Sequence, residues 1–297
     1  MHFNLDNGDT TRPRLPRTAA VTPGRGGQPR LLIDAPAGSA EIYLHGAHLT
    51  AWTPRGGRPV IFTSRRAVFD GAAAIRGGVP LCLPWFGAGV SGARRPAHGW
   101  GRISTWQLRS VESRADGGVQ ALLALERDGI AALYSVGVGE ELSLTVSLRR
   151  TGAADAYADE PVEVALHSYL AVGDVTAVEV TGLDGAAYLD KVTGMSGRIQ
   201  HGPLRITAPT DRVFDSGAPV TVTDPAYGRR ITVTGVRARN TVVWNPWSAG
   251  AASMTDLDDD EFVSMLCVES AVVGGNAVRL GPGESVSLGT RIAVAPL

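Results

Sequence analysis

Short hydrophobic runs with the periodicity of β-strands recur along most of the chain. The clearest is ELSLTVSLR, in which Leu142, Leu144, Val146 and Leu148 alternate with polar residues, so that a strand there has one apolar face and one polar face. Each run is short and is bounded by Gly, Pro, Asp or Asn, which favour turns. The pattern predicts strands over residues 31–34, 40–44, 106–113, 141–149, 162–170, 220–224, 229–236, 241–245, 262–270 and 284–294.

No long stretch has a helical period, so the sequence predicts an antiparallel all-β protein with few, short helices. Residues 1–28 are polar and rich in Pro, Arg and Gly, and we expect a loosely structured N-terminal lead-in there. Residues 29–297 show no linker or internal repeat and are predicted to form a single domain. The stretch AADAYADEP, residues 153–161, lies between two predicted strands and is expected to be a long hairpin loop.

Composition and charge exclude several classes of partner. The hydrophobic fraction of 44% and the charged fraction of 19% are ordinary for a globular protein, and the net charge is only −1. No overall field therefore attracts nucleic acid or a membrane surface. The chain begins without the apolar core of a signal peptide and has no apolar run of about 20 residues, so we expect a cytoplasmic protein. Its oligomeric state is not fixed by the sequence, and a monomer is the default expectation.

The two cysteines carry no chemical signal. Cys82 and Cys267 each lie within an apolar run and are far apart in the chain. Such a pair does not form a disulfide framework or a zinc site, and the residues are predicted to be small buried side chains.

Two arginine-containing segments are candidates for binding an anion or a sugar. In AIRGGVPLCLPWFG, residues 74–87, Arg76 precedes a Gly-Gly turn beside an apolar wall, and in RRPAHGWGRISTW, residues 94–106, His98 and Arg102 flank two glycines and a tryptophan. Indole faces suit sugar rings, and Arg76 and Arg102 together could hold a phosphate. The alternatives are structural: solvated surface arginines and a histidine that only supports a turn.

Two residues on predicted strands are candidates for acid–base chemistry. His167 interrupts the apolar run at 162–170, and Glu269 lies at the end of the run at 262–270. A fully buried Glu is rare unless it is paired or functional, so Glu269 is a candidate general base. Taken alone, a histidine on a strand, such as His167, is more often a satisfied core residue than a catalyst. The acidic run DLDDDE, residues 256–261, lacks the spacing of an EF-hand and is predicted to be a solvated turn. No nucleophile elbow, glycine-rich phosphate loop or metal-ligand spacing is present.

Taken in order, eight short motifs resemble those of the aldose 1-epimerase family, and more closely its D-hexose-6-phosphate (glucose-6-phosphate) mutarotase branch. Each is weak alone, but their order across nearly the whole chain, from about residue 30 onward, is specific. The motifs are GAHLTAW (46–52), IRGGVPLCLPWFG (75–87), HGWGR (98–102), LHSYL (166–170), LDKV (189–192), TDRVF (210–214), VVWNPW (242–247) and CVESA (267–271).

This resemblance implies a large antiparallel β-sandwich of the galactose mutarotase type, with the sugar in an open cleft on one sheet. His167 matches the family's general acid and Glu269 its general base. His98 and Asp211 match residues that bind sugar hydroxyls, while the phosphate-sugar branch presents arginines at the positions of Arg76 and Arg102. The implied substrate is a hexose or a hexose phosphate, and neither a metal nor an organic cofactor is implied.

The implied reaction needs one acid and one base. Glu269 removes the proton of the anomeric hydroxyl while His167 protonates the ring oxygen, and the opened aldehyde closes on its other face. Three alternatives remain open at this point: a mutarotase of unphosphorylated aldoses, a glycoside hydrolase or lyase on a similar fold, and a non-catalytic carbohydrate-binding protein. Hydrolysis usually requires two carboxylates, whereas the motifs supply one beside a histidine.

Overall fold

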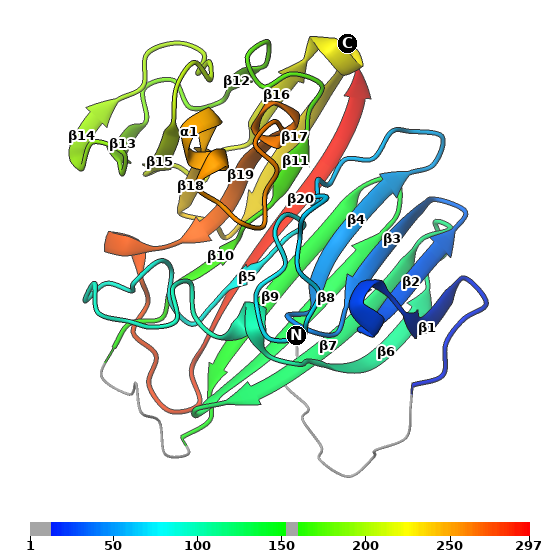
Figure 1. The fold of residues 1–297 in the computed structure, drawn as a ribbon. Coiled ribbons are helices and arrows are strands. Elements are labelled where there is room, and N and C mark those ends of the chain that lie inside the picture. Colours follow the sequence, from blue (N-terminus) through cyan, green and yellow to red (C-terminus); the bar gives the residue numbers. More distant parts are fainter. Residues whose placement is uncertain (1–12, 153–159) are drawn as a thin grey trace.

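The computed structural model describes residues 13–152 and 160–297, and it consists of antiparallel β-strands joined by turns (Figure 1). The expected all-β class is confirmed, since the only α-helix among the described residues is the short α1 (Trp247–Ala252). The strands form one sheet of four strands and two sheets of eight. Short 3-10 helices occupy Arg25–Gly27, Gly101–Ile103, Pro225–Tyr227, Glu261–Ser264 and Gly274–Asn276.

One eight-stranded sheet carries the candidate site and is called the site sheet here. Its longest strand, β19, pairs along one edge with β18 and along the other with β10 and then with β11. In spatial order the strands are β14 (Met195–Ile199), β13 (Ala187–Asp190), β15 (Thr210–Phe214), β18 (Asn240–Asn245), β19 (Met265–Val272), β10 (Val164–Leu166) and β5 (Leu81–Cys82), with β11 (Tyr169–Ala171) also on β19.

The second eight-stranded sheet lies against the first and is called the back sheet. The four-stranded sheet, called the small sheet, packs against the back sheet and shares its hydrophobic cluster. The back sheet contains, in order, β12 (Glu179–Thr181), β16 (Val220–Asp224), β17 (Arg229–Val236), β20 (Ser285–Pro296), β9 (Leu142–Arg150), β8 (Ile130–Val138), β7 (Val119–Arg127) and β6 (Gln107–Ser113). The small sheet contains β1 (Ala19–Pro23), β2 (Pro29–Ala35), β3 (Gly38–Tyr43) and β4 (His48–Pro54).

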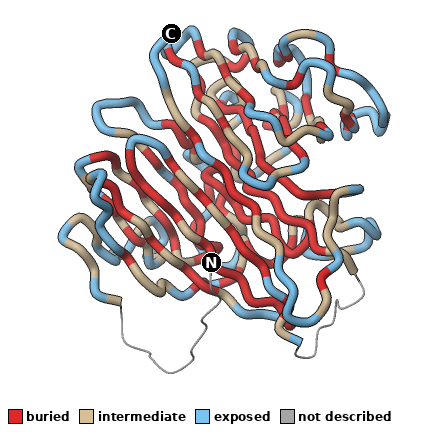
Figure 2. The backbone as a smooth tube through the Cα atoms, turned by 180° about the vertical axis from the view of Figure 1, so that it is seen from behind, coloured by how far each residue is buried: buried red, intermediate tan, exposed pale blue. Residues whose placement is uncertain are grey.

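A single hydrophobic cluster joins the three sheets. It includes Ile42 of the small sheet, Leu144 of the back sheet and Val268 of the site sheet, all of them fully buried. Figure 2 shows the buried positions running along the strands while the exposed positions gather at the turns. The alternation predicted for β9 is observed, because Leu142, Leu144 and Val146 lie in the cluster. Removal of this apolar surface from water is the main force that holds the layers together.

Strand β19 is buried on both of its faces. Leu266 and Val268 point into the main cluster, whereas Cys267, between them, packs in a smaller cluster on the opposite side. Glu269 shares that opposite side because side chains alternate along a strand. On the neighbouring strand, Val242 is the register partner of Glu269. This side of the sheet, which faces away from the main core, is called the site face below.

The N-terminal expectation is wrong for part of its range. Residues 19–23 form β1, which pairs with β2 in a register that places Ala19 opposite Ile33, and a 3-10 turn follows at Arg25–Gly27. The Arg25 backbone N–H donates to the Tyr43 hydroxyl at 2.9 Å, which fixes the turn to the small sheet. An edge strand with mostly exposed side chains need not alternate between apolar and polar residues, so its sequence does not predict a strand. Residues 1–12 of the predicted lead-in lie outside the described residues.

Most predicted strands are present, with shifted ends, and one is divided. The run at 162–170 forms β10 and β11 with a break at His167 and Ser168. Strands β4, β5, β7, β8 and β12–β15 were not predicted. Most residues of the predicted hairpin loop, 153–159, lie outside the described residues. In the described part of the chain no helix is long and apolar enough to cross a membrane.

Candidate active site

The Gly77-Gly78 turn fixes the backbone beside Arg76. Both glycines have positive φ, 98° and 67°, and a Cβ on Gly78 would lie only 2.3 Å from Nε2 of His48. That imidazole is fully buried, so burial lowers its pKa to about 3 and keeps the ring neutral. Its Nε2 lies 2.8 Å from the Gly77 carbonyl oxygen and is therefore the protonated nitrogen that donates to it. The turn is specified by close packing, as the Gly-Gly pair suggested.

Arg76 is held by two side chains from distant parts of the sequence. Its Nε donates to Oδ1 of Asp256 at 3.1 Å, and its Nη1 donates to the Tyr169 hydroxyl at 3.1 Å. The side chain is about one quarter exposed. These contacts leave the second Nη nitrogen of this guanidinium for a ligand.

Residues 98–102 bring a second arginine to the same region. His98 has a φ of 64°, and a Cβ on Gly99 would lie 2.0 Å from the Leu83 carbonyl oxygen, so the tight turn requires glycine there. The Gly87 N–H donates to Nδ1 of His98 at 3.3 Å. Burial, and then the positive charge of Arg102, lower the pKa of His98 to about 3, so its ring is neutral. Arg102 donates through Nη2 to the Ala97 carbonyl at 2.9 Å, while its buried Nε has no protein partner among the described residues.

His167 occupies the break between β10 and β11 and is surrounded by aromatic rings. Its ring stacks on Tyr169, with centroids 4.9 Å apart and an interplanar angle of 15°. The rings of His98 and Trp244 meet it edge-on at 5.9 and 6.0 Å. Its Nδ1 is buried and has no hydrogen-bond partner in the described chain. Burial, with smaller contributions from His98, Arg102 and Arg76, holds the pKa of His167 well below its ordinary value.

Glu269 lies beside His167 and is 1% exposed. Its Oε1 is 3.3 Å from Nε2 of His167, within ion-pair distance but without the alignment of a hydrogen bond. Neither carboxylate oxygen accepts a hydrogen bond from any described residue. Burial raises the pKa of Glu269 well above its ordinary value, and this effect is reinforced by Asp211 and opposed by Lys191. A carboxylate without donors in a buried position is costly unless a ligand supplies them.

Asp211 and Lys191 form the other edge of the site face. Lys191 Nζ lies 3.3 Å from Oδ2 of Asp211, and the Lys191 backbone N–H donates to the Asp211 carbonyl at 2.8 Å. Burial raises the pKa of Asp211, and the ammonium of Lys191 opposes that rise. The same ammonium lies 5.2 Å from the centre of the Phe86 ring, which meets the His98 ring edge-on. Successive side-chain contacts therefore connect the Lys191–Asp211 ion pair, through Phe86, to His98 and His167.

The structure brings the six predicted site residues to one region of the site face. His167 contacts Glu269 and His98 directly, Arg76 reaches His167 through Tyr169, and Arg102 and Asp211 influence the charge of the central pair. Three residues of the site were not predicted: Tyr169, Lys191 and Asp256.

Two of these residues left a signal in the sequence. His167 and Tyr169 are two positions apart, the spacing that places side chains on one face of a strand. Lys191 is the only lysine among 28 lysine and arginine residues in the chain. The chain uses arginine everywhere else and has one lysine near the buried His–Glu pair, which marks that position as special, because lysine presents a compact charge that the arginine fork does not.

The predicted solvated turn at 256–261 is confirmed for Asp259 and Asp260, which are exposed, but it is wrong for Glu261 at the end of the run. Glu261 is buried and accepts hydrogen bonds from the Ser64 hydroxyl at 2.6 Å, the Arg65 backbone N–H at 2.9 Å and the Asp258 backbone N–H at 3.0 Å. Arg65 also pairs with Asp258 and Asp260. The run therefore packs against the segment around Arg65, which is far away in the sequence. This packing places Asp256 beside Arg76.

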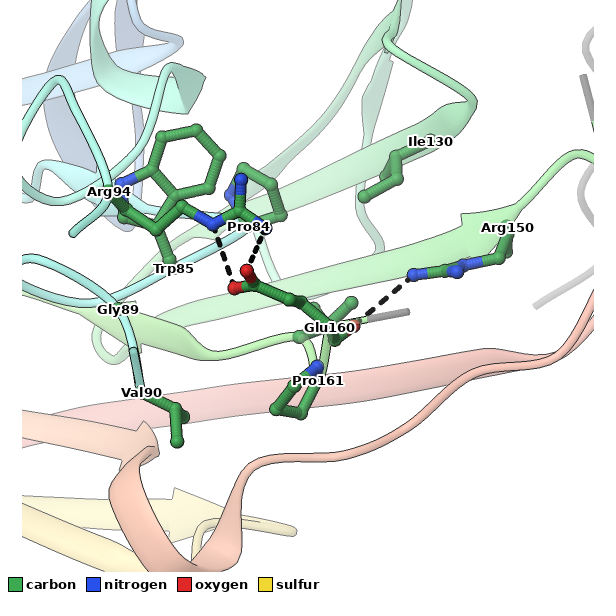
Figure 3. A pocket seen from close by; sticks show the side chains of 10 residues that line it. Pro84, Trp85, Gly89, Val90, Arg94, Ile130, Arg150, Glu160 and Pro161 are labelled. Atoms are coloured by element: carbon green, nitrogen blue, oxygen red, sulfur yellow. Dashed lines mark hydrogen bonds and ion pairs between the residues drawn. The ribbon is translucent and has the colours of Figure 1, made fainter. Parts of the chain in front are cut away.

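A small cavity lies apart from this group, and none of the six predicted residues lines it (Figure 3). Its volume is about 10 Å³, enough for about one water molecule. Arg94 lies across it, forms an ion pair with Glu160 at 2.6 Å and places its guanidinium 5.6 Å from the centre of the Trp85 ring. Arg150 donates to the Glu160 carbonyl. Arg94 thus serves the attachment of the 160–162 segment.

Comparison with known proteins places this chain and its fold in one family. The sequence profile described as aldose 1-epimerase matches residues 29–293. A protein of Escherichia coli K12, provisionally named glucose-6-phosphate 1-epimerase, is 34% identical over 257 residues, which cover 81% of this chain and 82% of the relative. A protein of Cenchrus ciliaris with the same provisional name is 30% identical over 265 residues, covering 82% and 78%.

A solved structure agrees with these relatives. The crystal structure of a provisionally named mutarotase, YeaD, from Salmonella typhimurium superposes with a TM-score of 0.86 at 28% identity, covering 96% of each chain. The fold is therefore of the galactose mutarotase type, as the motifs implied. The chain belongs to the aldose 1-epimerase family, and it is an isomerase of the sugar-epimerising class.

Proposed function

We propose that the protein interconverts the α and β anomers of an aldohexose 6-phosphate, with His167 as general acid and Glu269 as general base. The observation that carries this proposal is the buried contact of 3.3 Å between the two side chains. Both oxygens of the carboxylate and Nδ1 of the imidazole lack protein partners in the described residues, so the polar groups of this pair are available to a substrate.

Each residue has a defined step in the reaction. Glu269, ionised, accepts the proton of the anomeric hydroxyl, and His167, protonated, donates a proton to the ring oxygen as the C1–O5 bond breaks. Rotation about C1–C2 turns the aldehyde, and the reverse transfers close the ring on its other face. A positioned acid or base contributes on the order of 10²–10⁴ in rate. His98 and Asp211 border this pair and are the proposed partners of the sugar hydroxyls.

The phosphate is assigned to Arg76 and Arg102. Each guanidinium retains donors that its protein contacts do not use, and guanidinium groups match phosphate oxygens in geometry. The provisional names of the relatives point to the same substrate class.

The test follows the exchange between anomers of glucose 6-phosphate and of glucose by NMR. We expect acceleration of the phosphosugar well beyond the spontaneous rate, and its loss in His167→Ala and in Glu269→Ala. Arg76→Ala and Arg102→Ala should impair the reaction of glucose 6-phosphate far more than that of glucose. Wild-type rates in both acid–base variants would refute the mechanism, and equal losses on the two sugars would refute the phosphate assignment.

A further inference from the structure

The protein's own residues oppose the ionisation state that the reaction requires. The mechanism needs a protonated His167 and an ionised Glu269, yet burial lowers the pKa of the first and raises that of the second. Both groups therefore favour their neutral forms before substrate arrives, with the shared proton on the carboxyl group. Moving that proton across the 3.3 Å contact to Nε2 would create the acid and the base together, with no proton gained or lost.

The charges around the pair are unevenly distributed. Arg76 bonds to the hydroxyl of Tyr169, whose ring stacks on His167. Arg102 follows His98, whose ring meets His167 edge-on. The positive charges of Arg102 and Arg76 both act on the imidazole of His167 and disfavour a third positive charge there. On the other side of the pair, the carboxylate of Asp211 opposes a negative charge on Glu269, and the ammonium of Lys191 favours it to a smaller extent.

The remaining groups around the pair do not remove the opposition of the two arginines to a charged His167. Asp256 offsets part of the charge of Arg76, but it bonds only Nε of that guanidinium. Asp211 is paired with Lys191, and the thiols of Cys82 and Cys267 are neutral because burial raises the pKa of each. The titratable and charged groups that face the pair are His98, Arg102, Arg76, Tyr169, Cys82, Cys267, Asp211 and Lys191.

We infer that the anionic group of the substrate switches the site on by cancelling the charge of Arg76 and Arg102, which lets the shared proton pass from Glu269 to His167. The Oε–H bond of Glu269 breaks and an Nε2–H bond forms on His167, leaving a carboxylate stabilised by Lys191 and an imidazolium no longer repelled by two bare cations. The inference rests on the proposed function and extends it, because the phosphate then contributes to the chemical step as well as to binding.

The anion need not be attached to the sugar for this effect. A free phosphite dianion that binds between Arg76 and Arg102 should activate the enzyme toward unphosphorylated glucose. We expect kcat/KM for glucose to rise roughly tenfold or more at saturating phosphite, since a change of one pKa unit alters the protonated fraction tenfold. Arg76→Met should abolish this activation, and it should turn over glucose faster than the wild type when no anion is present, because one opposing charge is gone.

The matched control is Arg230→Ala, which removes an exposed arginine from β17, a strand of the back sheet. This variant should respond to phosphite as the wild type does. If phosphite only competes with glucose 6-phosphate and never accelerates the exchange of glucose, the switch is wrong while the proposed function stands. If neither sugar is accelerated by the wild type, the proposed function falls and the switch falls with it.

A second readout does not depend on turnover. In protein labelled with 15N-histidine, the ring nitrogens of His167, assigned by comparison with His167→Gln, should move from neutral to imidazolium shifts when phosphite is added at constant neutral pH. Arg76→Met should show a larger imidazolium fraction before phosphite is added. A His167 signal that stays neutral at saturating phosphite would overturn the inference even if activation were observed.

Discussion

Glu261 and Glu269 lie close together in the chain and are both buried, but their surroundings differ in every polar contact. Glu261 accepts three hydrogen bonds from the segment around Ser64 and from its own loop, whereas Glu269 accepts none from the described residues. Hydrogen bonds repay the loss of water from a buried charge. Glu261 therefore holds two segments together, and Glu269 retains its capacity to accept hydrogen bonds for a ligand.

The largest expected effect separates the two carboxylates by activity. Glu269→Gln removes the proposed base but preserves shape, and it should lower kcat for glucose 6-phosphate by roughly 10²–10⁴. Initial rates of anomer exchange, measured on protein shown to be folded by circular dichroism, check this. A variant that retains more than half of the wild-type kcat would remove Glu269 from the mechanism.

The same variant should not lose stability near neutral pH. Because the pKa of Glu269 is raised in the folded state, the folded protein binds more protons than the unfolded chain, so this group's contribution to stability falls as pH rises above about 4.5. Glutamine avoids that loss. The melting temperature of Glu269→Gln should equal or exceed that of the wild type at pH 7, and any advantage should shrink toward pH 4.5. A variant that melts lower than the wild type at pH 7 would contradict this account.

The next effect is on stability and concerns Glu261. Glu261→Ala leaves the Ser64 hydroxyl and two backbone N–H groups without their acceptor in a buried place, which should lower the free energy of unfolding by about 2–4 kcal/mol. Urea unfolding measures the change. If Glu261→Ala is as stable as the wild type, the hydrogen bonds to Glu261 contribute nothing to the free energy of unfolding, and the proposed structural role of Glu261 is refuted.

These two residues also show how far sequence reasoning reaches. Glu269 could be predicted because it stands in an apolar strand, where alternation gives both its burial and its face, and because ordered motifs assigned it a role. Glu261 could not be predicted, because its partners at residues 64 and 65 are almost two hundred positions away. The local pattern of an acidic run is the same whether water or a distant basic segment solvates it.

The same limit applies to the strands and to the site. Runs with clear alternation, such as β9, were predicted, whereas the exposed edge strand β1 was not, because its residues, AAVTP, do not alternate between apolar and polar. The break at His167 was missed because its apolar flanks continue the pattern of a strand. The motifs identified the residue types, but the contacts from Tyr169 and Asp256 to Arg76 arise only when three separate segments fold together.

A smaller effect is expected at Lys191, which supplies the positive charge nearest to Glu269 on the side of Asp211. Lys191→Met should lower kcat roughly tenfold, the scale of one pKa unit, while Lys191→Arg should retain more activity because it keeps the charge. The chain has no other lysine, so among its amino groups cyanate can carbamylate only this side chain and the N-terminus. Carbamylation should lower the activity of the wild type but should not lower that of Lys191→Met any further. Equal activity of Lys191→Met and the wild type would leave Glu269 without this electrostatic support.

The smallest effect tests whether the acidic loop acts on the site by charge or by position. Asp256→Asn keeps an oxygen for the Nε–H of Arg76 but removes the negative charge, so Arg76 becomes a stronger cation. Affinity for glucose 6-phosphate should rise, and the anion-free rate on glucose should fall, each by roughly two- to fivefold, as expected for a partly exposed pair worth about 0.5–1 kcal/mol. Asp260→Asn removes a charge from the same loop at an exposed pair with Arg65 and should change neither value. A weaker affinity for glucose 6-phosphate in Asp256→Asn would show that the loop acts on Arg76 by holding it in position. Glu261, which attaches that loop to the segment around Ser64, would then contribute to substrate binding through Arg76.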